Sequence, residues 1–139
     1  MAPLAVLSEI EKKYANQKVT VLGIHVGNIG MAELARAAAA GGANFPQALD
    51  VGTDQTAGST LANYHVQLYP TTVIIDRQGR IAFSTDDEQT GALSRQAAAK
   101  LGLRFPLPES LSPEEEAITW NRIFATMISA QLDRAVTPK

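Results

Sequence analysis

The sequence contains no cysteine among its 139 residues. A chain without thiols forms no disulfide, offers no thiolate nucleophile and supplies no sulfur ligand to a metal. Histidine is also scarce, because His25 and His65 are the only two and neither has an acidic companion at metal-ligand spacing. We therefore expect no metal site and no bound cofactor.

An excess of charge of one sign is also lacking. The chain has 12 Lys and Arg against 14 Asp and Glu, a formal net charge of −2. Binding of nucleic acid requires clustered cations, and the basic residues are scattered along this sequence, so we expect no nucleic-acid partner. No apolar run approaches the ~20 residues that span a membrane. The N-terminus lacks a basic region and soon reaches Glu9 and Glu11, so we expect no targeting signal.

What is present is the composition of an ordinary globular protein, with 45% hydrophobic residues and a length that suits one domain. The first part of the chain alternates helical and strand patterns. An amphipathic helix at 3–15 precedes a β-branched, apolar run at 19–26 that is typical of a strand covered on both faces. A helix at 31–40, a short strand at 47–50 and a short helix at 60–64 follow. This order predicts an α/β fold.

The second part of the chain contains the clearest local signals. Two strand-like runs at 71–76 and 80–84 are separated by a turn in which Gly79 supplies positive φ, so they should form an antiparallel hairpin. A helix is expected at 90–101. Residues 102–112 are rich in proline and indicate a linker. A final helix is expected from Pro113, because Ser112 is a capping residue and three glutamates follow the proline.

One segment carries a family resemblance. The pattern Tyr64-x-Val66, Pro70-Thr71-Thr72 and Ile75-Asp76-Arg77-x-Gly79-Arg80-Ile81, preceded by Val19-Thr-Val-Leu-Gly-Ile-His-Val26, resembles the thioredoxin-like superfamily, specifically its TlpA/ResA-like and AhpC/TSA groups. The resemblance covers residues 1–101. It implies a thioredoxin-like mixed sheet flanked by helices, with residues 102–112 as linker and 113–139 as a C-terminal helical extension.

The resemblance also implies a site. In that family a cis-proline faces a Cys-x-x-Cys motif and offers backbone hydrogen bonds to an extended peptide, so Tyr69, Pro70 and Thr71 are expected to form a peptide groove. Tyr69 is larger than the usual residue; it either caps the groove or fills the space left by the absent cysteines, and we favour filling. The family's members are often extracytoplasmic.

Two parts of the family's pattern are missing. The segment Met1-Ala-Pro-Leu4 resembles the stretch just after the second cysteine, so both the cysteines and the central strand before them are absent. Three explanations stand: the chain is a fragment of a longer protein, its two remaining inner strands pair directly, or another chain supplies the strand. We expect a domain related to thiol–disulfide oxidoreductases but redox-inactive as written.

The alternative is a non-enzymatic interaction module that holds a protein or peptide partner, or a second copy of the chain. Such a module would use the groove at Tyr69–Thr71 or the last helix. The apolar stripe of that helix is a candidate interface, formed by Trp120, Phe124, Met127 and Ile128. The stripe is equally well explained if the helix folds back on its own domain.

Overall fold

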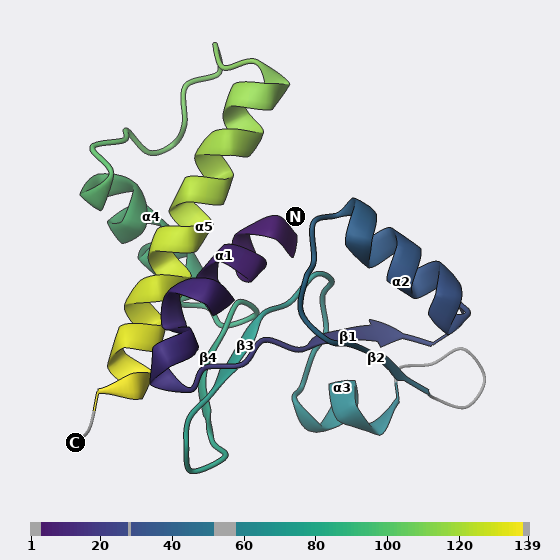
Figure 1. Ribbon diagram of the computed structural model, residues 1–139. Helices are drawn as coiled ribbons and strands as arrows, with labels where there is room; N and C mark the ends of the chain where they lie inside the picture. The colour runs from purple at the N-terminus through teal and green to yellow at the C-terminus, as the bar shows by residue number, and fades with distance from the viewer. Residues whose placement is uncertain (1–3, 28, 52–57, 138–139) are drawn as a thin grey trace. The chain divides into compact units, whose positions relative to one another are not determined.

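The computed structural model describes residues 4–27, 29–51 and 58–137 (Figure 1). Its helices are α1 (Leu4–Tyr14), the 3₁₀ helix η1 (Ala15–Gln17), α2 (Met31–Ala40), α3 (Ser59–Asn63), α4 (Thr90–Lys100) and α5 (Pro113–Val136). The strands are β1 (Gly23–Val26), β2 (Gln47–Asp50), β3 (Val73–Ile75) and β4 (Ile81–Ser84). The predicted α/β class is confirmed at this level, since helices and small sheets alternate along the chain.

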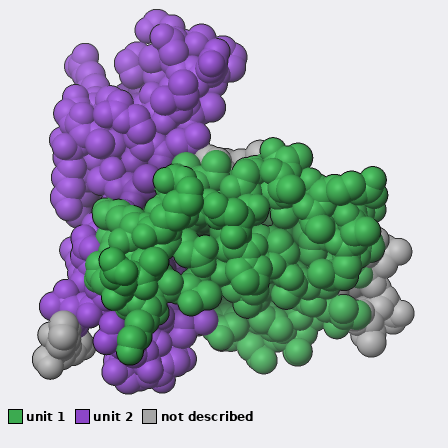
Figure 2. All heavy atoms as spheres, in the orientation of Figure 1, with its two compact units in different colours: residues 1–70 green, residues 71–139 purple. Residues whose placement is uncertain are grey.

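The chain divides into two compact units, residues 1–70 and 71–139 (Figure 2). This boundary lies within the segment 1–101 that we expected to form one domain. A division by compactness does not test a family-based domain, so the expected boundaries at 101 and 112 stay a prediction.

In the first unit β1 and β2 are parallel, in a register that runs from Gly23 opposite Gln47 to Val26 opposite Asp50, and α2 connects them. The strand predicted at 19–26 begins only at Gly23. One reason is that the Val21 N–H donates to Glu11 Oε1 at 3.1 Å and not to a neighbouring strand. A side chain of α1 therefore takes up this backbone N–H before the strand begins.

Helix α1 is joined to the turn between α2 and β2 by Ser8, a buried hydroxyl. Its Oγ donates to the Gly42 carbonyl at 3.0 Å and accepts from the Asn44 N–H at 3.1 Å. Gly42 has φ +79, the left-handed conformation that ends a helix and favours glycine. Helix α2 contributes Leu34 and Ala38 to the buried apolar residues of this unit, the turn before β2 contributes Phe45, and α3 contributes Leu61.

The second unit is built from the antiparallel hairpin β3–β4 and the helices α4 and α5. The hairpin and its turn are those predicted, with Gly79 at φ +76. Helix α5 also begins where predicted: the Ser112 Oγ accepts from the Glu115 N–H at 3.3 Å, and the Ser112 N–H donates to Glu115 Oε2 at 2.8 Å. These reciprocal bonds form a capping box. Helices α4 and α5 pack together, with Ser94 Oγ 3.7 Å from Met127 Sδ.

The strands form two separate two-stranded sheets and not the single mixed sheet that we expected. Across residues 4–27, 29–51 and 58–137, β1 pairs only with β2 and β3 only with β4. Direct pairing of β1 with β3, one of our three explanations for the absent central strand, would join the two units and stays a prediction. In the same ranges no helix has the length and apolarity needed to cross a membrane.

Candidate functional site

The segment Tyr69–Thr71 lies immediately before β3, as the sequence indicated. The peptide bond between Tyr69 and Pro70 is cis. Tyr69 is 60% exposed, so our expectation that it fills an interior space is wrong, and its ring is available to solvent. Thr71 is half-buried, and its Oγ1 donates to Asp86 Oδ1 at 2.6 Å. That bond ties the segment to the loop between β4 and α4.

The two histidines do not converge on a common site. His25 lies on β1 with its Nε2 2.9 Å from Gln47 Oε1 on β2, which makes it a cross-strand hydrogen-bonding residue. His65 is exposed and has φ 54. Among the residues described, no group of three or more histidines and carboxylates is placed to hold a metal ion.

The apolar stripe of α5 divides into a buried part and an exposed end. Met127 and Ile128 are 5% and 2% exposed, so no partner reaches them in this conformation. Phe124 is half-buried. Trp120 is 40% exposed, and its ring meets that of Phe105 edge to face at 5.9 Å. Of the four stripe residues, Trp120 is therefore the most accessible to a partner.

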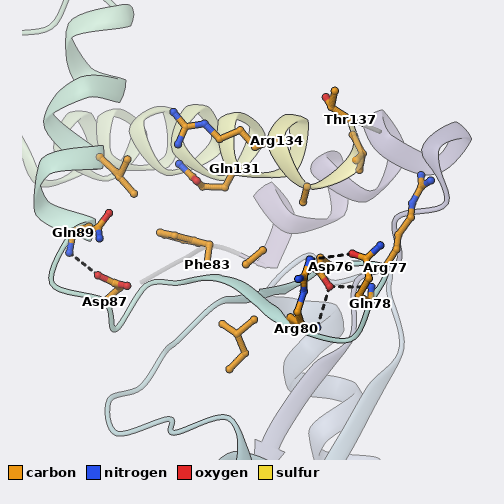
Figure 3. Close-up of a pocket in the computed structure, with 15 residues that line it drawn as sticks. Asp76, Arg77, Gln78, Arg80, Phe83, Asp87, Gln89, Gln131, Arg134 and Thr137 are labelled. Atoms are coloured by element: carbon orange, nitrogen blue, oxygen red, sulfur yellow. Dashed lines mark hydrogen bonds and ion pairs between the residues drawn. The ribbon is translucent and has the colours of Figure 1, made fainter. Parts of the chain in front are cut away.

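A groove that the sequence did not indicate lies in the second unit (Figure 3). We name it the hairpin groove; its volume is about 920 Å³. One end is formed by the turn between β3 and β4, the other by the loop before α4, and the last turns of α5 form a wall. Its apolar lining includes Phe83, Leu93, Ala135 and Val136, and its charged lining is Asp76, Asp87, Arg77, Arg80 and Arg134.

The turn end of the groove is held by Asp76. Its Oδ1 accepts from the backbone N–H groups of Gln78 at 2.9 Å and Arg80 at 3.0 Å, and its Oδ2 accepts from Arg80 Nε at 2.9 Å. The Arg80 backbone hydrogen bond is the main reason that the pKa of Asp76 lies below its usual value, and the Arg80 guanidinium adds to the effect. Asp76 is therefore ionised and already neutralised by Arg80.

Sequence reasoning missed the groove because its residues have ordinary local explanations. Arg77 and Arg80 belong to a turn, and Arg134 is a cation at a helix C-terminus, where the dipole favours one. No spacing pattern indicates that the end of α5 returns to the hairpin. Only the packing of α5 on β3 and β4 brings these arginines to one cavity.

Comparison with known proteins adds no relative. No family model, curated protein or solved structure matches the chain. The thioredoxin-like resemblance consequently rests on the residues that carry it and is treated below as a proposal.

Proposed function

We propose that this chain is a thioredoxin-like domain, related to thiol–disulfide oxidoreductases, that performs no thiol chemistry itself and acts by holding an extended protein or peptide partner at Tyr69–Thr71. The observation that carries the proposal is the absence of cysteine from a chain with this order of elements. Without a thiolate, the residues that remain of such a site can bind a peptide but cannot exchange a disulfide with it.

The order of elements supports the family part of the proposal. A parallel pair, β1 and β2, is connected through a helix, and a proline then leads into an antiparallel hairpin and a further helix. This is the order of elements that the sequence indicated within residues 1–101, the segment that the resemblance covers.

The binding part is supported by exposure and by chemistry. Tyr69 is more than half exposed, and an exposed tyrosine offers both an apolar ring and a hydroxyl to a partner at little entropic cost. The hydrogen bond between Thr71 and Asp86 fixes the residue that follows the proline. A fixed backbone next to an exposed aromatic ring is suited to an extended peptide.

The redox part is tested by reduction of insulin with dithiothreitol in the presence of the purified chain. We expect precipitation of the insulin B chain at the rate of a control without protein, because the chain has no cysteine to form a mixed disulfide. A matched positive control is any dithiol oxidoreductase at the same concentration. Turnover above the protein-free rate would overturn the claim that the chain lacks thiol–disulfide activity.

The exposed end of α5 supports a second candidate interface. Trp120 is partly exposed, and its Nε1 donates to Glu116 Oε1 at 3.3 Å, which orients the ring on the helix surface. Trp120→Ala would weaken a partner bound at this end and leave a partner bound at Tyr69–Thr71 unaffected. The two candidates are separated by testing the corresponding alanine variants, Tyr69→Ala and Trp120→Ala, against one partner.

A further inference from the structure

The hairpin groove follows the edge of β4. Three consecutive residues of the strand, Ile81, Ala82 and Phe83, all line it. Side chains alternate between faces in a regular strand, and the bulge at Ala82 interrupts this alternation, so all three residues border the groove along the strand. Within the described part of the chain, that edge carries no ladder, because β4 pairs only with β3.

The register of the hairpin shows where this edge is open. Ile74 pairs with Phe83 and Ile75 pairs with Ile81, so Ala82 is an extra residue on β4 with no partner residue on β3. The extra residue of a bulge is left out of the ladder. Ala82 is exposed and lines the groove, and its backbone is the natural first contact for an added strand.

Several features that usually prevent a further strand from pairing with a sheet edge are missing from β4. Natural sheets protect edges with proline, lysine or inward-pointing charge. The strand reads Ile81-Ala-Phe-Ser84 and contains none of these. Two protective features remain, the shortness of the strand and its bulge, and the bulge faces a cavity of about 920 Å³.

The charges of the groove favour an acidic occupant. Three arginines, Arg77, Arg80 and Arg134, line it against two carboxylates, an excess of one positive charge in a chain whose net charge is −2. Asp76 is neutralised by Arg80 at 2.8 Å, and Asp87 lies at the opposite end, where it accepts from the Gln89 N–H at 2.8 Å (Figure 3). With Arg80 paired to Asp76, the other arginines of the lining are Arg77 at the hairpin turn and Arg134 on α5.

We propose that the hairpin groove binds an extended, acidic peptide segment of another protein, which adds as a strand to the edge of β4 and places a carboxylate near Arg134. Main-chain hydrogen bonds supply affinity, Phe83 and Leu93 receive an apolar side chain, and the arginines select acidic sequence. This surface is separate from Tyr69–Thr71, and the proposal does not depend on the thioredoxin-like resemblance.

The probe is a fluorescein-labelled heptapeptide of threonine, valine and glutamate, titrated with the full chain and followed by fluorescence anisotropy. Two matched peptides serve as controls: one with lysine in place of glutamate, and one N-methylated at alternate backbone nitrogens. We expect the acidic peptide to bind at least about ten-fold more tightly than either, because the first control reverses the charge and the second removes the strand's hydrogen bonds.

Two substitutions on one helix test the charge. Arg134→Glu should weaken binding about five- to ten-fold, whereas Arg122→Glu, also exposed on α5 but outside the groove, should change it less than about two-fold. Ala82→Pro should abolish binding, because proline has no N–H to donate. Circular dichroism establishes that each variant is folded.

Amide chemical-shift mapping on the unmodified chain makes the test independent of any variant. We expect the acidic peptide to shift the amides of Ile81, Ala82 and Phe83 and to leave those of Tyr69 and Thr71 unchanged. Absence of shifts at 81–83, or equal binding of the N-methylated peptide, would overturn the proposal. Concentration-dependent shifts at 81–83 without peptide would also overturn it, because they would show a second copy of the chain at this edge.

Discussion

Among single residues, Asp50 organises the connection between β2 and α3. Its Oδ1 accepts from the Thr60 N–H at 3.2 Å and its Oδ2 from the Leu61 N–H at 2.8 Å. Helix α3 has glycine at its N-cap and no capping side chain of its own, so Asp50 takes that role from a distance. The Leu61 hydrogen bond, aided by those of Thr60, holds the pKa of Asp50 below its usual value of 3.8.

The lowered pKa of Asp50, together with those of two other carboxylates, leads to a prediction of how stability depends on pH. The pKa values of Asp50, Asp76 and Glu115 are all lowered by hydrogen bonds in the folded chain. A group with a depressed folded pKa stabilises the native state above its unfolded pKa, and that contribution is lost as pH falls through the folded value. We therefore expect urea midpoints to be constant from pH 7 to about 5 and to fall steadily below about 4.

Asp50→Asn isolates the contribution of one group. It should lower the urea midpoint at pH 7, because the amide oxygen is a weaker acceptor, and it should flatten the decline below pH 4. Asp87→Asn is the control, since Asp87 is exposed and accepts from one turn N–H. An unchanged acid slope in the Asp50→Asn variant would contradict the role given to Asp50.

Gly42 gives a second prediction at this scale. Its φ is +79, and a Cβ there would lie 2.9 Å from the Ala5 Cβ on α1. Gly42→Ala should therefore destabilise the chain by about 1–2 kcal/mol through backbone strain and crowding. Gly91→Ala, inside α4 with only the Arg95 side chain nearby, should be neutral or stabilising by up to about 1 kcal/mol. Urea unfolding of both variants measures the difference, and equal effects would contradict the account.

Among the helices and strands, α5 is the one whose stability depends most clearly on the hydrogen bonds of its first turn. The capping box of Ser112 and Glu115 satisfies two terminal N–H groups, and Glu114 to Glu116 face the positive end of the helix dipole. Ser112→Ala should lower the free energy of unfolding by about 1 kcal/mol. Ser110→Ala, an exposed serine two residues earlier and outside the box, should have no measurable effect. Similar losses in both variants would refute the capping role.

The helices and strands also show which parts of the structure could be predicted from the sequence. The start of α5 and the hairpin turn at Gly79 follow from short-range chemistry, namely capping residues and a glycine at positive φ. The start of β1 does not, because it depends on contacts with other elements, among them the hydrogen bond from Val21 to Glu11 on α1. The exposure of Tyr69 was predicted wrongly for the same reason, since burial depends on neighbours that no local pattern names.

For the whole molecule, the sequence indicated an α/β class and the absence of thiol chemistry, but neither the division into two units nor the hairpin groove. The groove arises where α5 returns to the hairpin, and such a return is decided by packing between elements far apart in the chain. The absence of cysteine, and with it the expected absence of thiol chemistry, follows from the composition alone. Binding at Tyr69–Thr71 is therefore proposed from the sequence, whereas the second binding surface, the hairpin groove, is proposed from the structure.

Selection of peptides by the chain, followed by mapping of where they bind, tests the central claim most directly. Random linear peptides displayed on phage would be selected against the purified chain, and amide chemical-shift changes would locate each selected peptide. Apart from acidic peptides that shift 81–83, we predict a group of selected peptides that shifts Tyr69 and Thr71 and binds Tyr69→Ala at least about ten-fold more weakly than the unmodified chain, since an aromatic anchor carries much of such an interface. A selection in which no peptide shifts Tyr69 and Thr71, and every peptide binds Tyr69→Ala with unchanged affinity, would contradict it.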